Sequence, residues 1–131
     1  MKYLPPFDVI KSQMTMHTVN GELMVTCSYE TFVDAIRRAI AGVEVDEAWY
    51  RRRYPDISEA IDKGVVASAQ RHFVNDGYFE GRQPREIRVD EAWYLKQNEG
   101  VADYVQRGLL ESGQQHFDEN GYKEGRLPFP L

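Results

Sequence analysis

The sequence predicts a mainly α-helical protein in which an N-terminal β-hairpin and helix cap two tandem 44-residue repeats, each of three short helices. Two observations carry this fold class. The six residues VDEAWY begin at Val45 and again at Val89, and such self-similarity marks units that pack against one another. Before the first copy, two β-prone runs precede an amphipathic pattern. We therefore divide the chain into 1–43 and 44–131, with repeats at 45–88 and 89–131.

The hairpin is predicted over 14–19 and 22–26. These runs flank Asn20 and Gly21, a dipeptide suited to the positive φ angles of a type I′ turn. A two-stranded hairpin is marginally stable alone. We therefore expect it to pack on the first repeat as a cap or on a second chain as a dimer interface.

A helix is predicted to follow, with Ser28 as its N-cap and Gly42 beyond its end. Its apolar residues recur at helical spacing and form one stripe that needs a partner surface. Cys27, the single cysteine, cannot form an intrachain disulfide and is expected to be a small buried hydrophobic residue. The stripe consists of Tyr29, Phe32, Val33, Ile36 and Ile40.

Each repeat carries the boundary signals of three helices. In the first copy, Asp46 is the expected N-cap of helix 47–54, which ends before Pro55. A second helix starts with Asp56 and Glu59 at capping-box spacing and ends at Gly64. A third is capped by Ser68 and runs to Gly77. The second copy repeats these signals at Asp90, Gly108, Ser112 and Gly121.

One corner differs between the copies, since Asn98-Glu99-Gly100 replaces Tyr54-Pro55-Asp56. Because the second copy lacks the proline, we predict a looser or differently bent junction there. Elsewhere the register needs no gap, and Pro84 and Pro128 close the two copies.

The matched residues are those that build the unit. Large aromatic side chains supply much buried area in a repeat with few core positions, and the matched glycines are expected at positive φ or at close approaches. The predicted repeat core comprises Trp49, Tyr50, Trp93, Tyr94, His72, Phe73, His116 and Phe117.

A second matched set is chemically richer. His72, Tyr78, Glu80 and Arg82 recur as His116, Tyr122, Glu124 and Arg126. Histidine and glutamate could act as acids or bases, but an enzyme seldom needs two copies of one acid/base set. We predict a structural network in which Arg82 and Arg126 pair with a glutamate or with helix C-terminal carbonyls. No catalytic residue, metal or cofactor is predicted, because the three histidines are scattered and no phosphate-binding glycine loop occurs.

Charge and hydropathy restrict the partners. A net charge of −5 opposes affinity for nucleic acid or anionic lipid. Prolines and an early aspartate interrupt any apolar run near the start, so we expect a cytoplasmic protein without membrane insertion. The stacked repeats should leave a groove lined by the variable positions 51–53 and 95–97. Candidate binding residues are Arg51, Arg52, Arg53, Lys96, Tyr78, Tyr122, Arg82 and Arg126.

The pattern W-Y, Y-P-D-I, H-F, G-Y, E-G-R and P at 49–84 resembles a short tandem helical repeat of bacterial proteins. That repeat is found beside glycosyltransferase domains or in proteins linked to surface polysaccharide. The resemblance covers about 45 to 128 and implies an accessory module; it carries over no catalytic residues.

The sequence thus favours a non-enzymatic interaction or regulatory module, a scaffold whose partner is another protein or a second copy in a homodimer. The resemblance adds a possible role in polysaccharide synthesis or export. Two alternatives stay open: a glycan or sugar-phosphate binding module that uses Trp49, Trp93, Tyr78 and Tyr122 as stacking platforms, and a small enzyme that uses His72 or His116.

Overall fold

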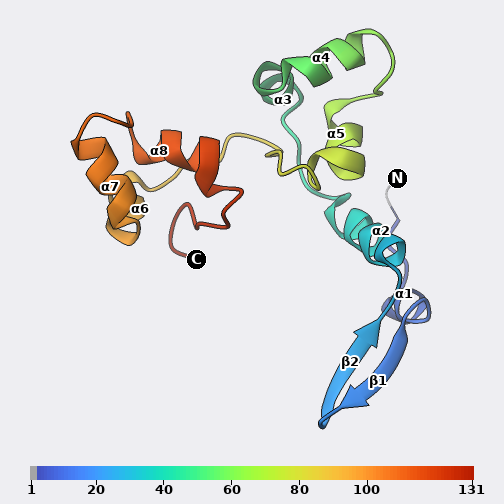
Figure 1. The fold of residues 1–131 in the computed structure, drawn as a ribbon. Coiled ribbons are helices and arrows are strands. Elements are labelled where there is room, and N and C mark those ends of the chain that lie inside the picture. Colours follow the sequence, from blue (N-terminus) through green and yellow to red (C-terminus); the bar gives the residue numbers. More distant parts are fainter. Residues whose placement is uncertain (1–2) are drawn as a thin grey trace. The chain divides into compact units, whose positions relative to one another are not determined.

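The structure is a computed structural model that describes residues 3–131. Within that range it contains eight α-helices and a two-stranded antiparallel sheet (Figure 1). The chain divides into two compact units, the N-terminal unit Met1–Glu44 and the helical unit Val45–Leu131. Each unit is described by itself.

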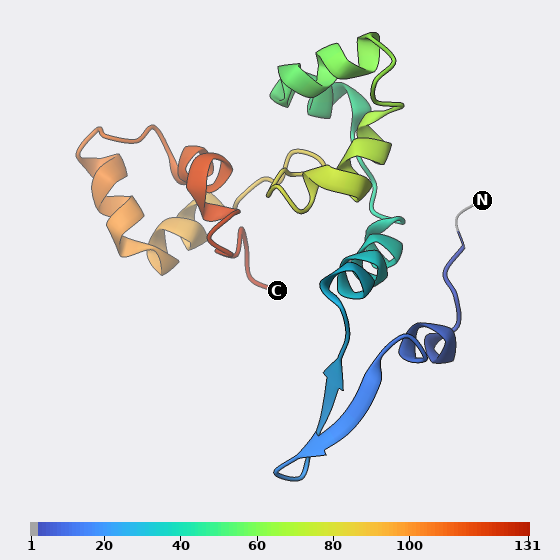
Figure 2. The same ribbon diagram turned by 45° about the vertical axis from the view of Figure 1, so that its right-hand side comes forward.

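The N-terminal unit contains the predicted hairpin, a twisted ribbon in Figure 2. β1 (Thr15–Val19) pairs with β2 (Glu22–Thr26), so that Val19 lies opposite Glu22. Asn20 and Gly21 have φ angles of 50° and 79°, the positive values that a type I′ turn requires. The hairpin prediction is confirmed. Every residue of both strands is exposed.

Helix α2 (Tyr29–Ile40) follows β2, and its predicted cap and end are confirmed. The Oγ of Ser28 accepts a hydrogen bond from the backbone N–H of Thr31 at 3.1 Å. Its apolar stripe is partly buried in this single chain: Val33 is buried, whereas Tyr29 and Phe32 remain largely in solvent. A short helix α1 (Phe7–Lys11) precedes the hairpin and was not predicted from sequence.

Cys27 is half-buried. The expectation of a buried residue was wrong because Cys27 lies in the connection between β2 and α2.

The helical unit begins with a first segment, 45–88, that folds as α3 (Glu47–Arg53), α4 (Pro55–Asp62) and α5 (Ala69–His72). A π-helical turn, η1 (Phe73–Gly77), continues α5. Asp46 and Ser68 accept hydrogen bonds from Trp49 N–H and Arg71 N–H, as N-caps do,. The predicted boundaries hold at these helices, except that the last turn before Gly77 is π-helical.

The predicted capping box at Asp56 was wrong. α4 begins at Pro55, which occupies the first helical position favoured by its fixed φ. Tyr54 is therefore the N-cap residue and makes no side-chain capping bond. Asp56 lies in the first turn, so its carboxylate is free to bond elsewhere.

The second segment, 89–131, contains α6 (Glu91–Gln97), α7 (Glu99–Gln106), α8 (Gly113–His116) and the π-helical turn η2 (Phe117–Gly121). Asp90 and Ser112 cap α6 and α8. The predicted difference at the first junction was wrong: Asn98 has φ −127° and ψ 75°, against −125° and 79° at Tyr54. Asn98 supports the same bend through its side-chain N–H, which donates to the carbonyl of Tyr94 at 2.8 Å.

Backbone bonds close both segments. The N–H of Asp46 donates to the carbonyl of Pro84 at 3.1 Å, and that of Asp90 to Pro128 at 2.9 Å. Each bond joins the start of a segment to its end. The core residues between them include Tyr50, Phe73, Tyr94 and Phe117, all essentially without solvent exposure.

Candidate functional site

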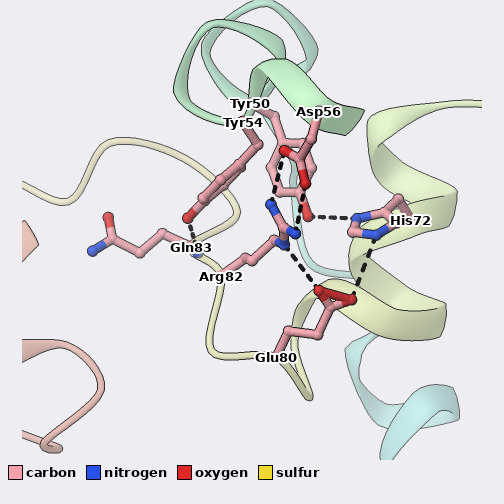
Figure 3. A network of polar contacts seen from close by, with 7 residues as sticks. All are labelled: Tyr50, Tyr54, Asp56, His72, Glu80, Arg82 and Gln83. Atoms are coloured by element: carbon pink, nitrogen blue, oxygen red, sulfur yellow. Dashed lines mark hydrogen bonds and ion pairs between the residues drawn. The ribbon is translucent and has the colours of Figure 1, made fainter. Parts of the chain in front are cut away.

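The first segment contains a polar network built on the buried Tyr50 (Figure 3). The Tyr50 hydroxyl shares a 2.9 Å hydrogen bond with Nδ1 of His72. On the other side of the imidazole, Nε2 lies 3.7 Å from a carboxylate oxygen of Glu80. Helix α3 thus supplies the phenol, and α5 supplies the imidazole. The turn after η1 supplies the carboxylate that continues the network.

Arg82 completes this network. Its Nε donates to Glu80 at 3.1 Å, and its two terminal nitrogens donate to the Asp56 carboxylate at 3.3 and 3.0 Å. In Figure 3 the guanidinium lies between the two acids. Its carbon lies 4.8 Å from the ring centre of Tyr54, within the range of a cation–π contact. Arg82 therefore clamps the start of α4 to the C-terminal turn of the segment.

Burial and pairing shift the ionisation of this network. Burial raises the pKa of the Tyr50 phenol strongly, despite an opposing effect of Arg82. The hydrogen bond from Arg82 lowers the pKa of Asp56. Burial alone would lower the pKa of Arg82, but the bonds to Asp56 and Glu80 outweigh it and raise that pKa. At neutral pH the network therefore holds a protonated phenol and a charged clamp.

The second segment repeats the inner part of the network. The Tyr94 hydroxyl shares a 2.8 Å hydrogen bond with Nδ1 of His116, and Arg126 donates to Glu124 at 2.6 Å. Burial raises the pKa of Tyr94, and Arg126 lowers that of Glu124. The contacts of the arginine's terminal nitrogens, the outer part of the network, differ. Arg126 donates to the amide oxygen of Asn98 at 2.5 Å, and Gly100 stands where the first segment has Asp56.

The side chains of each matched acid/base set thus bond largely to one another and to the buried tyrosine of their segment. The predicted glutamate partners are present at both arginines. Sequence reasoning missed Asp56 as the second partner of Arg82; the only signal was the Y-P-D corner present in one copy. It also missed Glu47 and Glu91. The Glu47 carboxylate accepts from the N–H groups of Ala69 and Gln70 at 2.9 and 3.1 Å, and Glu91 does the same at Gly113 and Gln114.

The predicted core residues occupy the interior of the segments to different degrees. The tyrosines Tyr50 and Tyr94 and the phenylalanines Phe73 and Phe117 are fully buried. His72 is buried, whereas Trp49, Trp93 and His116 are intermediate.

The structure brings some of the basic candidates together and separates others: Arg53 and Arg82 line one cavity, whereas Arg126 lines another. Arg51 bonds to Ser58 at 3.0 Å and pairs with Asp62. Arg53 instead donates to the backbone carbonyl of Asp118 at 3.3 Å. Arg52 and Lys96 are exposed on separate helices. Of the positions predicted to line one groove, Arg53 and Gln97 line two different cavities.

The cavity at Arg53 lies where the two segments meet and measures about 260 Å³. Tyr54, Tyr122 and Lys123 line it together with Gln83 and Asp118. Gln83 is buried, and its Oε1 has no hydrogen-bond partner within the described range 3–131. Burial raises the pKa of Asp118. Of the aromatic candidates, Tyr122 therefore borders a polar cavity, and Tyr78 packs edge-on against Phe73 and Phe79.

Among residues 3–131, no group of three or more histidine, cysteine or acidic side chains could hold a metal ion. No helix in this range is long and apolar enough to cross a membrane. The comparisons with known proteins add no relative: no family model, curated protein or solved structure matches the chain.

Proposed function

We propose that the chain is a non-enzymatic protein-interaction module that self-associates through its N-terminal unit. In this proposal the helical unit is a pair of tandem repeats that acts as a rigid scaffold. The matched caps, junction angles and tyrosine–histidine bonds of the two segments support this part.

The observation that carries the interaction role is the exposed hairpin. All ten strand residues are exposed, and the apolar ones include Leu23, Met24 and Val25. Both outer edges carry backbone groups open to pairing, because the sheet has two strands only. A sheet of this size is marginal in water, whereas three or more strands with an apolar face are stable.

A second copy of this chain fits the β2 edge. Antiparallel self-pairing about Met24 would place Leu23 opposite Val25 and Glu22 opposite Thr26. No like charges would then face each other, which favours cross-strand pairing. Such a contact is two-fold symmetric and closes as a dimer. The exposed Tyr29 and Phe32 of α2 would add apolar area beside the sheet.

Light scattering coupled to size-exclusion chromatography tests this proposal. The native chain should elute as a dimer of about 30 kDa, twice the 15.2 kDa of one chain,. Met24→Lys places a charge on the pairing edge and should give a monomer. Val65→Lys is the matched control, because Val65 is an exposed apolar residue of the helical unit; it should leave the dimer intact. A native chain that is monomeric at every concentration would refute self-association.

The pathway part of the proposal rests on the repeat resemblance. Accordingly, we place the module as an accessory of bacterial polysaccharide synthesis or export. The native chain should capture a polysaccharide-synthesis enzyme, and a chain whose helical unit is unfolded should not. Equal capture by both chains would contradict this part of the proposal.

A second candidate, glycan binding, is favoured by the cavity between the segments. The unpartnered Oε1 of Gln83 needs a donor, and a sugar hydroxyl would supply one beside the Asp118 carboxylate and the Tyr122 ring,. Gln83→Leu, which copies the matched Leu127 of the second segment, should abolish sugar binding in calorimetry if this candidate holds. Unchanged sugar binding in that variant would refute it.

A further inference from the structure

The two matched arginines, Arg82 and Arg126, differ in what covers them. In the first segment the Tyr54 ring lies over the guanidinium, and the Asp56 carboxylate takes both terminal nitrogens. In the second segment Asn98 takes the place of the ring, and Gly100 takes the place of the carboxylate. The Arg126 side chain is accordingly 39% exposed, against 20% for Arg82.

The missing groups leave a cavity of about 420 Å³ in the second segment. Arg126, His116 and Asn98 form its polar side, and Tyr104 and Leu110 contribute apolar surface. A Cβ placed on Gly100 would meet no atom within 4 Å beyond its two chain neighbours and the backbone of its own helix. The space opened by the loss of the Asp56 side chain is therefore unfilled by neighbouring side chains.

We propose that this cavity binds an organic carboxylate that carries an aromatic ring. The carboxylate would accept from Nη2 of Arg126 and from the second N–H of Nη1, beside the one that donates to Asn98, as Asp56 accepts from both terminal nitrogens of Arg82,. Planar guanidinium and carboxylate groups match in this two-bond geometry. The ring would fill the apolar part of the cavity beside Tyr104 and Leu110, as the Tyr54 ring covers Arg82.

The charges around Arg126 leave room for such a ligand. Glu124 accepts from Nε and Asn98 from Nη1, whereas Nη2 has no hydrogen-bond partner among residues 3–131. One more acid, Glu99, lines the cavity, and it has no ion pair in the same range. Glu99 therefore repels a bound carboxylate, so Glu99→Gln should tighten binding.

Two sources could supply this chemistry: a free aromatic acid, or a tyrosine and an aspartate two residues apart in another protein, spaced as Tyr54 and Asp56 are here. The site is independent of hairpin-mediated self-association, because every residue that forms it belongs to the helical unit. A monomeric chain could bind the carboxylate, and a dimeric chain could fail to bind it. Failure of one proposal is thus distinguishable from failure of the other.

The test is a titration of the full chain followed by nitrogen–proton NMR. The probes are 3-(4-hydroxyphenyl)propanoate, its uncharged amide, and a blocked Tyr-Gly-Asp peptide. The free acid or the peptide should shift the Arg126 side-chain N–H and the Gly100 amide, and whichever binds tighter identifies the source. The uncharged amide should produce no such shifts, because it lacks the carboxylate.

Three variants make the result decisive. Gly100→Asp supplies an internal carboxylate and should weaken probe binding at least about tenfold, the scale of one charge-assisted hydrogen bond. Gln106→Glu is the matched control, because it adds the same charge at an exposed position of α7 outside the cavity; it should change affinity by no more than about twofold. Arg126→Gln should also abolish binding.

Three outcomes would overturn the proposal. The first is that neither the free acid nor the peptide shifts the two signals. The second is that the uncharged amide binds as well as the acid. The third is that the Gly100→Asp chain, shown to be folded by its melting curve, binds with native affinity. Because Gly100→Asp fills open space, its result stands even if Arg126→Gln fails to fold.

Discussion

The first and second segments of the helical unit share their inner bonds and differ in their outer ones. Both cap their helices with an aspartate and a serine, and both bury a tyrosine hydroxyl against a histidine. Only the first segment closes its arginine under a ring and a carboxylate.

The difference follows the cost of an unsatisfied group. A buried hydroxyl or imidazole without a partner costs free energy that water cannot restore, whereas an exposed arginine can be solvated. The bonds of Tyr50 and Tyr94 therefore recur, while the more exposed partners of the two arginines vary.

Gly77→Ala and Gly121→Ala should be the most damaging changes, with similar effects in both segments. A Cβ at either position would overlap the hydroxyl of Tyr50 or Tyr94. Overpacking and loss of the hydroxyl–imidazole bond should together cost about 2–4 kcal/mol of unfolding free energy. Urea unfolding measures this loss.

The Gly77→Ala/Tyr50→Phe double variant is the control for that mechanism, because it removes the overlapping oxygen. It should be less destabilised than the sum of the two single variants. Strict additivity would show that the overlap is relieved in some other way.

Removing the buried tyrosine hydroxyl alone should destabilise the two segments to different degrees. Tyr50→Phe leaves Nδ1 of the buried His72 without its partner and should cost about 1–2 kcal/mol. Tyr94→Phe should cost less, because His116 is more exposed and water can replace the phenol. Thermal or urea unfolding of both variants checks the order, and equal losses would contradict the explanation from burial.

The aspartate that pairs with the arginine should be transferable from the first segment to the second. Gly100→Asp should stabilise the chain by about 1 kcal/mol, because it removes a glycine from the helix and adds an ion pair to Arg126. The reciprocal Asp56→Gly should destabilise by a similar amount. Melting temperatures of the two variants and of the control Gln106→Glu measure this exchange; a destabilised Gly100→Asp chain would show that the cavity cannot accept the carboxylate as Asp56 is accepted.

Acid should weaken the ion pair between Asp56 and Arg82 in the first segment. The folded-state pKa of Asp56 is lowered by Arg82, so the pair stabilises the fold above the unfolded pKa of about 4. That contribution is lost as pH falls through the lower folded value. Because the carboxylate is 62% exposed, the effect should be a few tenths of a kcal/mol. Asp56→Asn should flatten the acid limb of the stability profile by that amount, and an unchanged limb would exclude the clamp as its cause.

Local signals account for what could be predicted from the sequence. Asn20 and Gly21 take the positive φ angles of their turn, and Ser28, Asp46 and Ser68 cap helices. Each of these features depends on bonds between residues a few positions apart, so the local sequence is enough to predict it. The glutamate partners of Arg82 and Arg126 could also be predicted, because each lies two residues from its arginine in the sequence.

Contacts between distant residues of one segment were decided by tertiary structure alone. Asp56 reaches Arg82 over 26 residues, and the carboxylate of Glu47 reaches Ala69 over 22. Nothing in the spacing of these residues fixes their directions, which depend on how α3, α4 and α5 pack. The same holds for the cavity beside Arg126: the sequence shows that Gly100 replaces Asp56, but only the packed segment shows that no other side chain fills the space.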